Sequence, residues 1–296
     1  MSRISAPGPA DGFVPDYLIV GHVTRDIVAD GHVIGGTVTY AGLTAVALGR
    51  RVAAVTSAGD DFDVARALPS IRFQVRRAPA TTTFENVYHG GHRQQWIRAV
   101  AAPLDHSLIP EGWRHAPIVH LAPLAREFGA EMIAAFSNYG LLGLTPQGWL
   151  RRWNADGFVE RCSWERPEEV LKVCDAVVLS EEDVDGDWEL LRGYAEVTRL
   201  LVVTQGARGC TVFQRGRAWQ VAAFPAIEVD ATGAGDVFAA AFFTHLLDHG
   251  DPVQAAHYAN CVASFAVEAL GTAGIPTREA IARRLAAHPL SPTVIQ

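Results

Sequence analysis

The sequence predicts an α/β fold built on one mostly parallel central sheet. Short apolar runs alternate with helix-forming stretches through the chain, an order typical of parallel strands joined by helical crossovers. Glycine and proline punctuate a largely helical final part. The expected strands are 17–20, 53–56, 118–121, 141–144, 176–179 and 200–204, and the expected helices are 41–48, 62–68, 125–136, 168–172, 188–196, 234–247, 252–270 and 278–287.

One segment departs from this pattern. Residues 81–100 mix β-formers with polar side chains around a His89-Gly90-Gly91 turn. A polar hairpin of this kind does not suit a core strand of a parallel sheet, whose strands are apolar on both faces. The sequence therefore predicts a β flap that lies over the rest of the molecule.

Composition indicates an ordinary globular chain. Of 296 residues, 49% are hydrophobic and 19% charged, and the net charge is -7. An acidic chain without clustered basic residues is a poor nucleic-acid binder. No apolar stretch reaches membrane-span length and no signal-peptide pattern opens the sequence, so we expect no membrane partner and a cytoplasmic location. We expect a disordered tail over residues 1–15 and one domain over 16–290.

Four cysteines are scattered along the chain without a Cys-x-x-Cys pair, so a zinc site is not expected. They are Cys162, Cys174, Cys210 and Cys261.

The chemistry-bearing segment is Asp230-Ala-Thr-Gly-Ala-Gly-Asp236. Its small residues leave backbone N–H groups uncovered where a helix begins, and a helix N-terminus attracts anions, phosphoryl groups above all. Two roles are then open to Asp236: it caps the helix, or it is a base that takes a proton from an attacking hydroxyl. The room made by Gly233-Ala234-Gly235 favours the base.

Two other nucleotide motifs are absent. A Walker loop needs Gly-Lys-Ser/Thr, but the single lysine, Lys172, follows Leu171. A dinucleotide fingerprint needs a third glycine where Phe238 stands. A nicotinamide oxidoreductase is therefore disfavoured.

Residues 230–238 resemble the C-terminal signature of the ribokinase/PfkB carbohydrate kinases. Further similarity lies in Gly35-Gly36 with the following segment to Gly49, in Ala58–Phe62, and in Thr204-Gln-Gly206-Ala-Arg-Gly209. The resemblance runs from Tyr17 to about Ile275. It implies a ribokinase-like three-layer sandwich with a small β lid, formed by strands near 31–39 and 81–100. It also implies an ATP-dependent kinase acting on a sugar or polyol hydroxyl.

The resemblance assigns roles to individual positions. Asp236 is implied as the base, with Gly233, Ala234 and Gly235 as the anion hole. The acceptor would meet Asp26, Gly35, Gly36, Tyr40 and Glu85, and the nucleotide would meet Ser180, Asp183, Thr204, Gly206, Gly209, Asn260 and Ser264. Mg²⁺ would be held through water by Glu182 or Asp183. A monovalent cation, K⁺ as candidate, would lie at Asp230 and Thr232.

Two departures bear on the substrate. Tyr40 stands where the family has an asparagine that contacts the sugar, and a phenol ring stacks on a ring face instead of replacing an amide. Ser180-Glu-Glu-Asp183 replaces an Asn-x-x-Glu motif, with a solvated acidic helix start as the alternative reading. These features resemble a subgroup that includes plant myo-inositol kinases, which makes inositol or another cyclic polyol the leading substrate.

Other functions stay open on the sequence alone. A nucleoside is the alternative acceptor, because Tyr40 would give its base a stacking wall. A ligand sensor with weak catalysis is the alternative to an enzyme, motivated by the altered Ser180–Asp183 segment. The expected partners are the acceptor and ATP, and a homodimer through the lid is a further option.

Overall fold

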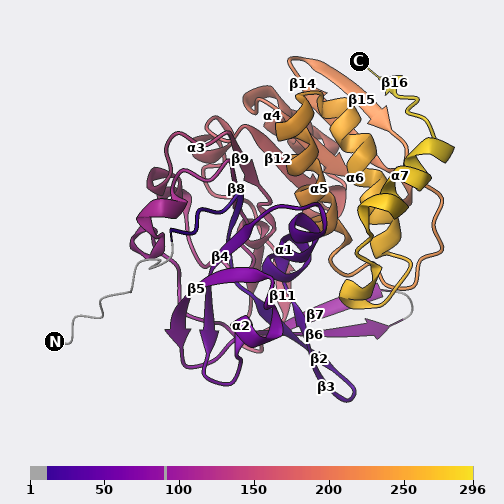
Figure 1. Cartoon of the computed structure of the whole chain (residues 1–296). Coiled ribbons are helices and arrows are strands. Elements are labelled where there is room, and N and C mark those ends of the chain that lie inside the picture. Colours follow the sequence, from indigo (N-terminus) through magenta and orange to yellow (C-terminus); the bar gives the residue numbers. More distant parts are fainter. Residues whose placement is uncertain (1–11, 90–91, 296) are drawn as a thin grey trace.

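A ten-stranded sheet runs through the centre of the molecule (Figure 1). Its strands are β1 Tyr17–Val20, β4 Val52–Gly59, β5 Ile71–Ala78, β8 Ile118–Leu121, β9 Leu141–Leu144, β12 Ala176–Ser180, β13 Leu201–Thr204, β14 Cys210–Gln214, β15 Arg217–Val221 and β16 Thr293–Val294. The computed structural model describes residues 12–89 and 92–295 and gives the order β16-β15-β14-β13-β12-β9-β8-β1-β4-β5. The neighbouring strands β5, β4, β1, β8, β9, β12 and β13 are parallel to one another. Strands β14, β15 and β16 pair in antiparallel fashion at one edge.

Strand β1 shows why the central strands are apolar throughout. Tyr17 and Ile19 enter one hydrophobic core, and Leu18 and Val20 enter a second core on the opposite face. Successive side chains of a strand point to opposite faces, so a strand covered on both faces needs an unbroken apolar run. The three layers and the ribokinase-like α/β fold predicted from the sequence are confirmed.

Helices cover both faces of this sheet. The first core contains residues of α1, α5, α6 and α7, which lie together in Figure 1, and α4 contributes to the second core. The helices are α1 Thr37–Ala47, α2 Val64–Ala67, α3 Glu168–Leu171, α4 Trp188–Val197, α5 Ala234–His249, α6 Pro252–Ala266 and α7 Arg278–Ala287.

A four-stranded lid projects from one edge of the molecule (Figure 1). Its order is β3-β2-β6-β7, with bounds β2 Thr24–Val28, β3 Gly31–Gly35, β6 Thr82–His89 and β7 His92–Ala99. The predicted flap at 81–100 is the β6–β7 hairpin. The strand expected over 31–39 ends at Gly35, because Gly36 caps α1 and Thr37 begins it.

A short hairpin fastens the lid to the main sheet. Its strands are β10 Arg151–Trp153 and β11 Val159–Arg161. Trp153 and Val159 pack against a small separate apolar cluster, made of Phe84, Ile97, Leu124 and Ala125. This cluster unites the lid, the hairpin and the segment after β8.

The helix expected over 125–136 is absent from the structure. Only residues Ala130–Ala135 form a 3₁₀ segment. The reason lies in Glu127, which is 2% exposed. Its carboxylate accepts the N–H groups of Leu124 at 2.9 Å, Ala125 at 2.7 Å and His22 at 2.7 Å. These bonds turn the chain back on itself where a helix would have continued.

The ends of the chain differ from the expected domain limits. Residues 1–11 of the expected tail lie outside the described residues, but Phe13 packs edge-on against Trp113 with ring centroids 6.4 Å apart. Beyond residue 290, β16 pairs with β15. The ordered packing therefore extends past both limits of the predicted 16–290 domain.

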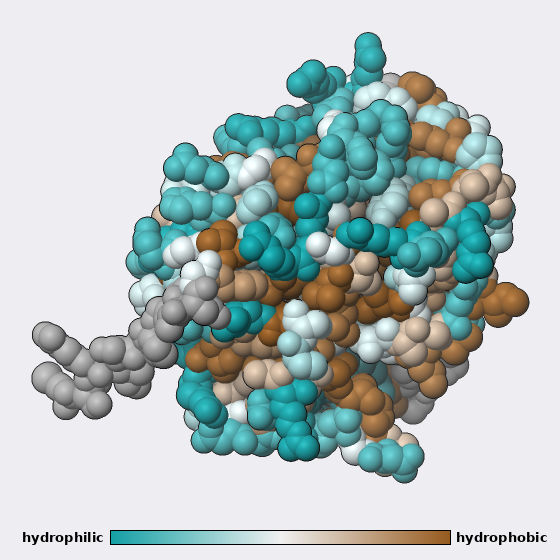
Figure 2. All heavy atoms as spheres, in the orientation of Figure 1, coloured by the Kyte–Doolittle hydropathy of each residue, from teal (hydrophilic) through white to brown (hydrophobic). Residues whose placement is uncertain are grey.

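Figure 2 shows one face of the molecule, with hydrophilic residues over much of its periphery and apolar residues across its middle. Among the helices of residues 12–89 and 92–295, none combines the length and hydropathy that a bilayer span requires.

Replacing Glu127 with alanine tests the buried carboxylate. It would leave three buried backbone N–H groups without their acceptor, and unmet buried donors cost about 1–3 kcal/mol each before relaxation. We expect the free energy of unfolding to fall by about 3 kcal/mol in urea titrations. Glu131→Ala, which removes one exposed bond to Gly129, is the control and should change it by about 0.5 kcal/mol or less. Equal effects of the two changes would contradict this account.

Candidate active site

A cavity of about 1270 Å³ opens between the sheet and the lid. It lies beyond the carboxyl ends of parallel strands, where Thr145, Ser180 and Thr204 reach it from β9, β12 and β13. Open α/β sheets bind their ligands at this edge. Of the residues predicted from the sequence, the cavity wall contains Asp26, Gly36, Tyr40, Ser180, Glu182, Asp183, Thr204, Gly206, Gly209, Asp230, Thr232, Gly233, Ala234, Gly235, Asp236, Asn260 and Ser264.

The N-terminus of α5 forms the floor of this cavity. Gly233 adopts the left-handed conformation (φ 77°) before the first helical residue, and Asp236 lies in the first turn. A side chain built at Gly235 would meet no atom within 4 Å, so open space lies beside this turn. The N–H of Ala234 donates to Ala231 within the loop at 3.2 Å. The following first-turn amides are therefore the better donors for an anion.

Tyr40 supports this loop from beneath. A Cβ at Gly233 would lie 2.3–2.5 Å from three atoms of the Tyr40 ring, and Tyr40 is 3% exposed. The ring face is thus covered by the anion-binding loop. Tyr40 also lines the cavity, so the expected stacking of its ring on a sugar or a nucleoside base stays a prediction, with one ring face covered by the loop.

Asp236 reaches across to the neighbouring helix. Its carboxylate accepts a hydrogen bond from the Thr37 side chain, in the first turn of α1. Burial raises the pKa of Asp236 to about 6, while Thr37 and the positive charge of Arg151 oppose the rise. A carboxyl with this pKa is ionised at neutral pH and still basic enough to accept a proton from a hydroxyl. These features support the hypothesis that Asp236 acts as a base.

The lid side of the cavity contains Asp26. Its Oδ1 accepts from Thr24 at 3.2 Å, and a Cβ at Gly35 would lie 2.6 Å from its Oδ2. Gly35 therefore does not line the cavity but makes room for the Asp26 carboxylate. Burial raises the pKa of the Tyr40 phenol, and the carboxylates of Asp26, Asp230 and Asp236 add to the rise.

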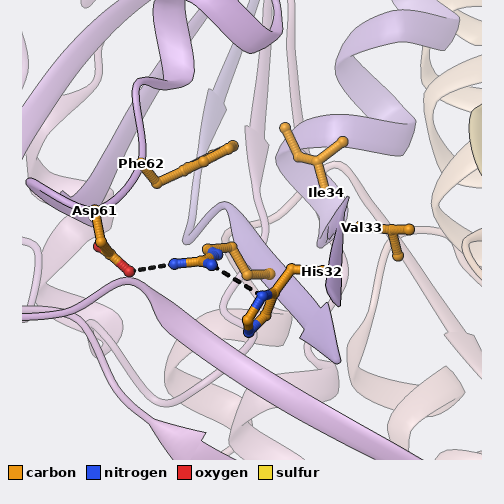
Figure 3. Close-up of a pocket in the computed structure, with 6 residues that line it drawn as sticks. His32, Val33, Ile34, Asp61 and Phe62 are labelled. Carbon is orange, nitrogen blue, oxygen red and sulfur yellow. Dashed lines mark hydrogen bonds and ion pairs between the residues drawn. The ribbon is translucent and has the colours of Figure 1, made fainter. Parts of the chain in front are cut away.

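Strand alternation sends the neighbour of Asp26 to the other face of the lid. Arg25 pairs with Asp61, which follows β4, and contacts His32 Nδ1 at 2.9 Å (Figure 3). Thr81 also donates to Asp61, at 3.0 Å. The Gly59-Asp60-Asp61 segment thus ties the lid to the sheet at a second, smaller cavity of about 270 Å³.

The assignment of Glu85 to the acceptor is wrong. On β6, Phe84 and Asn86 face the cavity, and Glu85 between them faces the opposite side because strand residues alternate. Its carboxylate forms an ion pair with Arg98 of β7 at 2.5 Å. The lid residues that face the cavity instead are Phe84, Asn86, Gln94 and Gln95.

The Ser180–Asp183 segment forms a capping box. Ser180 Oγ accepts from Glu182 N at 3.1 Å, and Asp183 Oδ2 accepts from Ser180 N at 2.9 Å. Gln147 donates to the other Asp183 oxygen at 3.3 Å. Both oxygens of Asp183 are therefore engaged, whereas Glu182 is exposed. Mg²⁺ prefers oxygen ligands and retains several waters, so Glu182 fits the expected water-mediated contact to Mg²⁺ better than Asp183 does.

At the opposite end, the cavity has an apolar recess. Its wall includes Ala223, Phe224, Pro225, Ala226, Ala263 and Val267. Gly209 closes the turn beside it, where a Cβ would lie 2.1 Å from Val221 O. The Asn260 amide donates to Val221 O and Ala222 O, both at 3.1 Å. Ser264 donates to Cys261 O and accepts from Arg284, each at 2.7 Å. These two side chains therefore shape the recess through bonds within the protein.

Asp230 anchors the signature loop. Its Oδ1 accepts from Thr232 N at 2.9 Å and its Oδ2 from Gly271 N at 3.0 Å. The described residues contain no group of three His, Cys, Asp or Glu side chains arranged for a metal ion. A monovalent cation at Asp230 and Thr232 stays a prediction.

Sequence reasoning missed Thr37 and Arg151 as site residues. Thr37 follows directly after Gly36, so its place in the first turn of α1 was a usable signal once that helix start was known. Arg151 carried no signal, because only the β10–β11 hairpin brings it to the cavity.

Known proteins resemble this chain in parts. Residues 175–278 match the pfkB family carbohydrate kinases. A fructokinase of Klebsiella pneumoniae is 35% identical over 104 residues, which are 30% of this chain and 34% of that protein. An inositol 3-kinase of rice, Oryza sativa subsp. japonica, is 40% identical over 77 residues, which are 26% of this chain and 19% of that protein. The chain thus spans about a third or less of the length of these curated relatives.

The fold is shared over nearly the whole chain. A variant of a pyrophosphate-dependent myo-inositol-1 kinase, converted into a myo-inositol-3 kinase, superimposes with a TM-score of 0.77 at 22% identity, covering 92% of this chain and 99% of that one. The chain therefore has a ribokinase-like α/β fold. Within that fold, residues 175–278 are the part of the chain that matches the pfkB family carbohydrate kinases.

Gly233→Ala tests the packing beneath the loop. The methyl group would collide with the Tyr40 ring, and alanine disfavours φ 77°. We expect a fall of about 2–4 kcal/mol in the free energy of unfolding, measured by urea titration. Gly235→Ala has open space and an ordinary φ, and serves as the control with an effect below about 1 kcal/mol. A well-tolerated Gly233→Ala would refute the contact.

Thr37→Val tests the bond to Asp236. The Thr37 hydroxyl favours the charged carboxylate, so its loss raises the pKa of Asp236 further above about 6. The acidic limb of the pH profile should therefore move to higher pH, while activity well above that limb changes less. The measurement is kcat/KM between pH 5 and pH 9, with Thr39→Val, whose hydroxyl donates to Gly35 O at 2.7 Å, as the control. An unmoved acidic limb would contradict the assigned bond.

Proposed function

We propose that this protein is an ATP-dependent kinase that phosphorylates a hydroxyl of a sugar or polyol. The observation that carries the proposal is the placement of Asp236. It lies at the N-terminus of α5, in one cavity with Asp26 at one end and an apolar recess at the other. The base thus sits between a polar acceptor end and a donor end.

The residues divide the chemistry as follows. Asp236 accepts the proton of the acceptor hydroxyl, whose oxygen forms the new bond to the γ-phosphorus as the bond to the ADP oxygen breaks. The first-turn amides of α5 donate hydrogen bonds to the phosphoryl oxygens. Glu182 would hold a bound Mg²⁺ through water, and the cation would supply charge neutralisation there. K⁺ at Asp230 and Thr232 is an additional proposed cation.

Inositol or another cyclic polyol is the preferred acceptor. Asn86, Gln94 and Gln95 of the lid bring amide groups to the part of the cavity that contains Asp26, and Gln95 donates to Asn86 at 2.9 Å. Each amide both donates and accepts, which matches a ring with several hydroxyls. The similarity to a rice inositol 3-kinase supports this choice.

ATP is the preferred donor. The recess lined by Ala223–Ala226, Ala263 and Val267 offers apolar area. The adenine ring of ATP would fill this area, whereas an inorganic phosphate donor would leave it empty. Pyrophosphate is the second candidate, because the structural relative with a TM-score of 0.77 is described as pyrophosphate-dependent.

Two alternatives remain as proposals of lower rank. A nucleoside acceptor loses support, since the Tyr40 ring face is covered by Gly233. A sensor without catalysis loses support, since Asp236 has both a raised pKa and open space beside it. We also propose a cytoplasmic location. The outer edge of β3 is the surface where a homodimer through the lid would form.

Asp236→Asn tests the proposal directly. Because the amide cannot accept the proton, kcat should fall by about 10³-fold or more, while ATP binding by calorimetry changes little. Wild-type protein is assayed with ATP or pyrophosphate and Mg²⁺ against myo-inositol, ribose, fructose, ketodeoxygluconate and adenosine. Asp248→Asn, at the far end of α5, is the matched control and should keep full activity. If Asp236→Asn kept near-wild-type turnover, Asp236 would not be the base.

The same panel separates the alternatives. Transfer to adenosine alone would indicate a nucleoside kinase. Stabilisation by a polyol and by ATP without release of ADP would indicate a sensor.

A further inference from the structure

The β10–β11 hairpin places a positive charge at the catalytic centre. Arg151 begins β10 and lines the cavity, and its charge acts on the Asp236 carboxylate. Neither the signature loop nor the Gly-Gly motif contains this residue. The hairpin lies about 80 residues before Asp236 in the sequence, so only tertiary structure brings the two together.

Of the adjacent residues Arg151 and Arg152, the first lines the cavity and the second is not among its lining residues. Arg151 shares a face of β10 with Trp153, which packs into the small apolar cluster under the lid. The Arg152 side chain is 63% exposed and pairs at 3.3 Å with Glu160, which lines the cavity. The chain thus offers two adjacent arginines in different environments.

The lid contacts this hairpin directly. Trp96 of β7 bridges to Phe158, with ring centroids 5.3 Å apart, and Ile97 N donates to Gly157 O at 2.8 Å. Gly157 has φ 82°, and a Cβ there would lie 2.3 Å from Ile97 O. The turn between β10 and β11 therefore fits tightly against the lid strand.

Positive charge is scarce in the cavity wall. Among the described lining residues, Arg151 and Arg161 are the two with a cationic side chain. Arg161 is engaged with the segment that carries Glu182: its Nε donates to Asp183 O at 2.9 Å, and it pairs with Asp185. Arg151 lies in a wall that also contains Asp26, Glu182 and Asp230, and its positive charge acts on the Asp236 carboxylate.

We propose that Arg151 binds the phosphoryl group during transfer, and that the lid holds it in place through the contact between Trp96 and Phe158. The inference rests on the proposed function. Arg151 forms no covalent bond and takes no proton. Its N–H groups donate to the phosphoryl oxygens, whose charge is spread over three atoms as the group moves between the two oxygens. A planar guanidinium suits this geometry.

The main experiment compares Arg151→Gln and Arg151→Lys with Arg152→Gln. Assays at pH 8 keep Asp236 ionised even if its pKa rises when the arginine is lost. We expect kcat to fall about 100-fold in Arg151→Gln, with KM for the acceptor changed less than about threefold. Arg151→Lys should recover part of kcat, and Arg152→Gln should match the wild type.

A binding measurement provides a readout other than turnover. ADP with Mg²⁺ and aluminium fluoride mimics the transferred group, whereas ADP alone leaves its place empty. We expect aluminium fluoride to add thermal stabilisation to the wild type and to Arg152→Gln, and to add none to Arg151→Gln. All three proteins should respond equally to ADP alone.

The lid contact is tested with Phe158→Ala. Loss of the Phe158 ring should reduce kcat about tenfold in the wild-type background. In the Arg151→Gln background it should leave kcat nearly unchanged, because Phe158 acts on the reaction only through Arg151. Additive effects in the double variant would overturn the coupling to the lid.

Several outcomes overturn the role of Arg151 itself. These are an unchanged kcat in Arg151→Gln, a loss confined to KM for the acceptor, or full stabilisation of Arg151→Gln by aluminium fluoride. Absence of transfer from ATP in the wild type together with an intact fluoride effect would refute the proposed function and leave the anion-binding role supported.

Discussion

The meeting of two helix N-termini, those of α1 and α5, is the contact on which the site depends. Thr37 at the start of α1 donates to Asp236 at the start of α5, and Tyr40, one turn further along α1, packs its ring against Gly233. The hydrogen bond from Thr37 fixes the Asp236 carboxylate, and the Tyr40 ring supports the loop at Gly233 that precedes α5. Two positive helix ends then border one cavity, which favours an anion there.

The raised pKa of Asp236 follows from the same arrangement. The cavity floor desolvates the carboxylate and raises its pKa to about 6, while Thr37 and Arg151 limit the rise. The charged form is therefore less favoured in the folded than in the unfolded chain. The resulting loss of stability grows as the pH rises from about 3.8 to about 6 and is complete above that range. A carboxylate with a raised pKa accepts a proton more readily than a free one, which is what the proposed role of Asp236 requires.

The lid belongs to the site as much as the sheet does. Alternation along β2 sends Asp26 into the cavity and Arg25 outward to Asp61, so one strand both contributes to the site and fastens the lid. Along β6 the same rule sends Asn86 inward and Glu85 outward. On the far side, β7 contacts the hairpin that carries Arg151. The lid thus reaches both the acceptor end and the catalytic centre.

The sequence by itself determined the fold class and the signature loop, because apolar runs such as 17–20 and small residues such as Gly233–Gly235 act through local geometry. It also placed Asp236 and Asp26 in one site. The tertiary structure alone decided the direction of each side chain and the partners it meets. Tyr40 became a support for the loop, Glu85 a partner of Arg98, and residues 125–136 a turn around buried Glu127. Arg151 reached the cavity only through the hairpin. Each of these outcomes depends on packing between segments far apart in sequence, which no local pattern records.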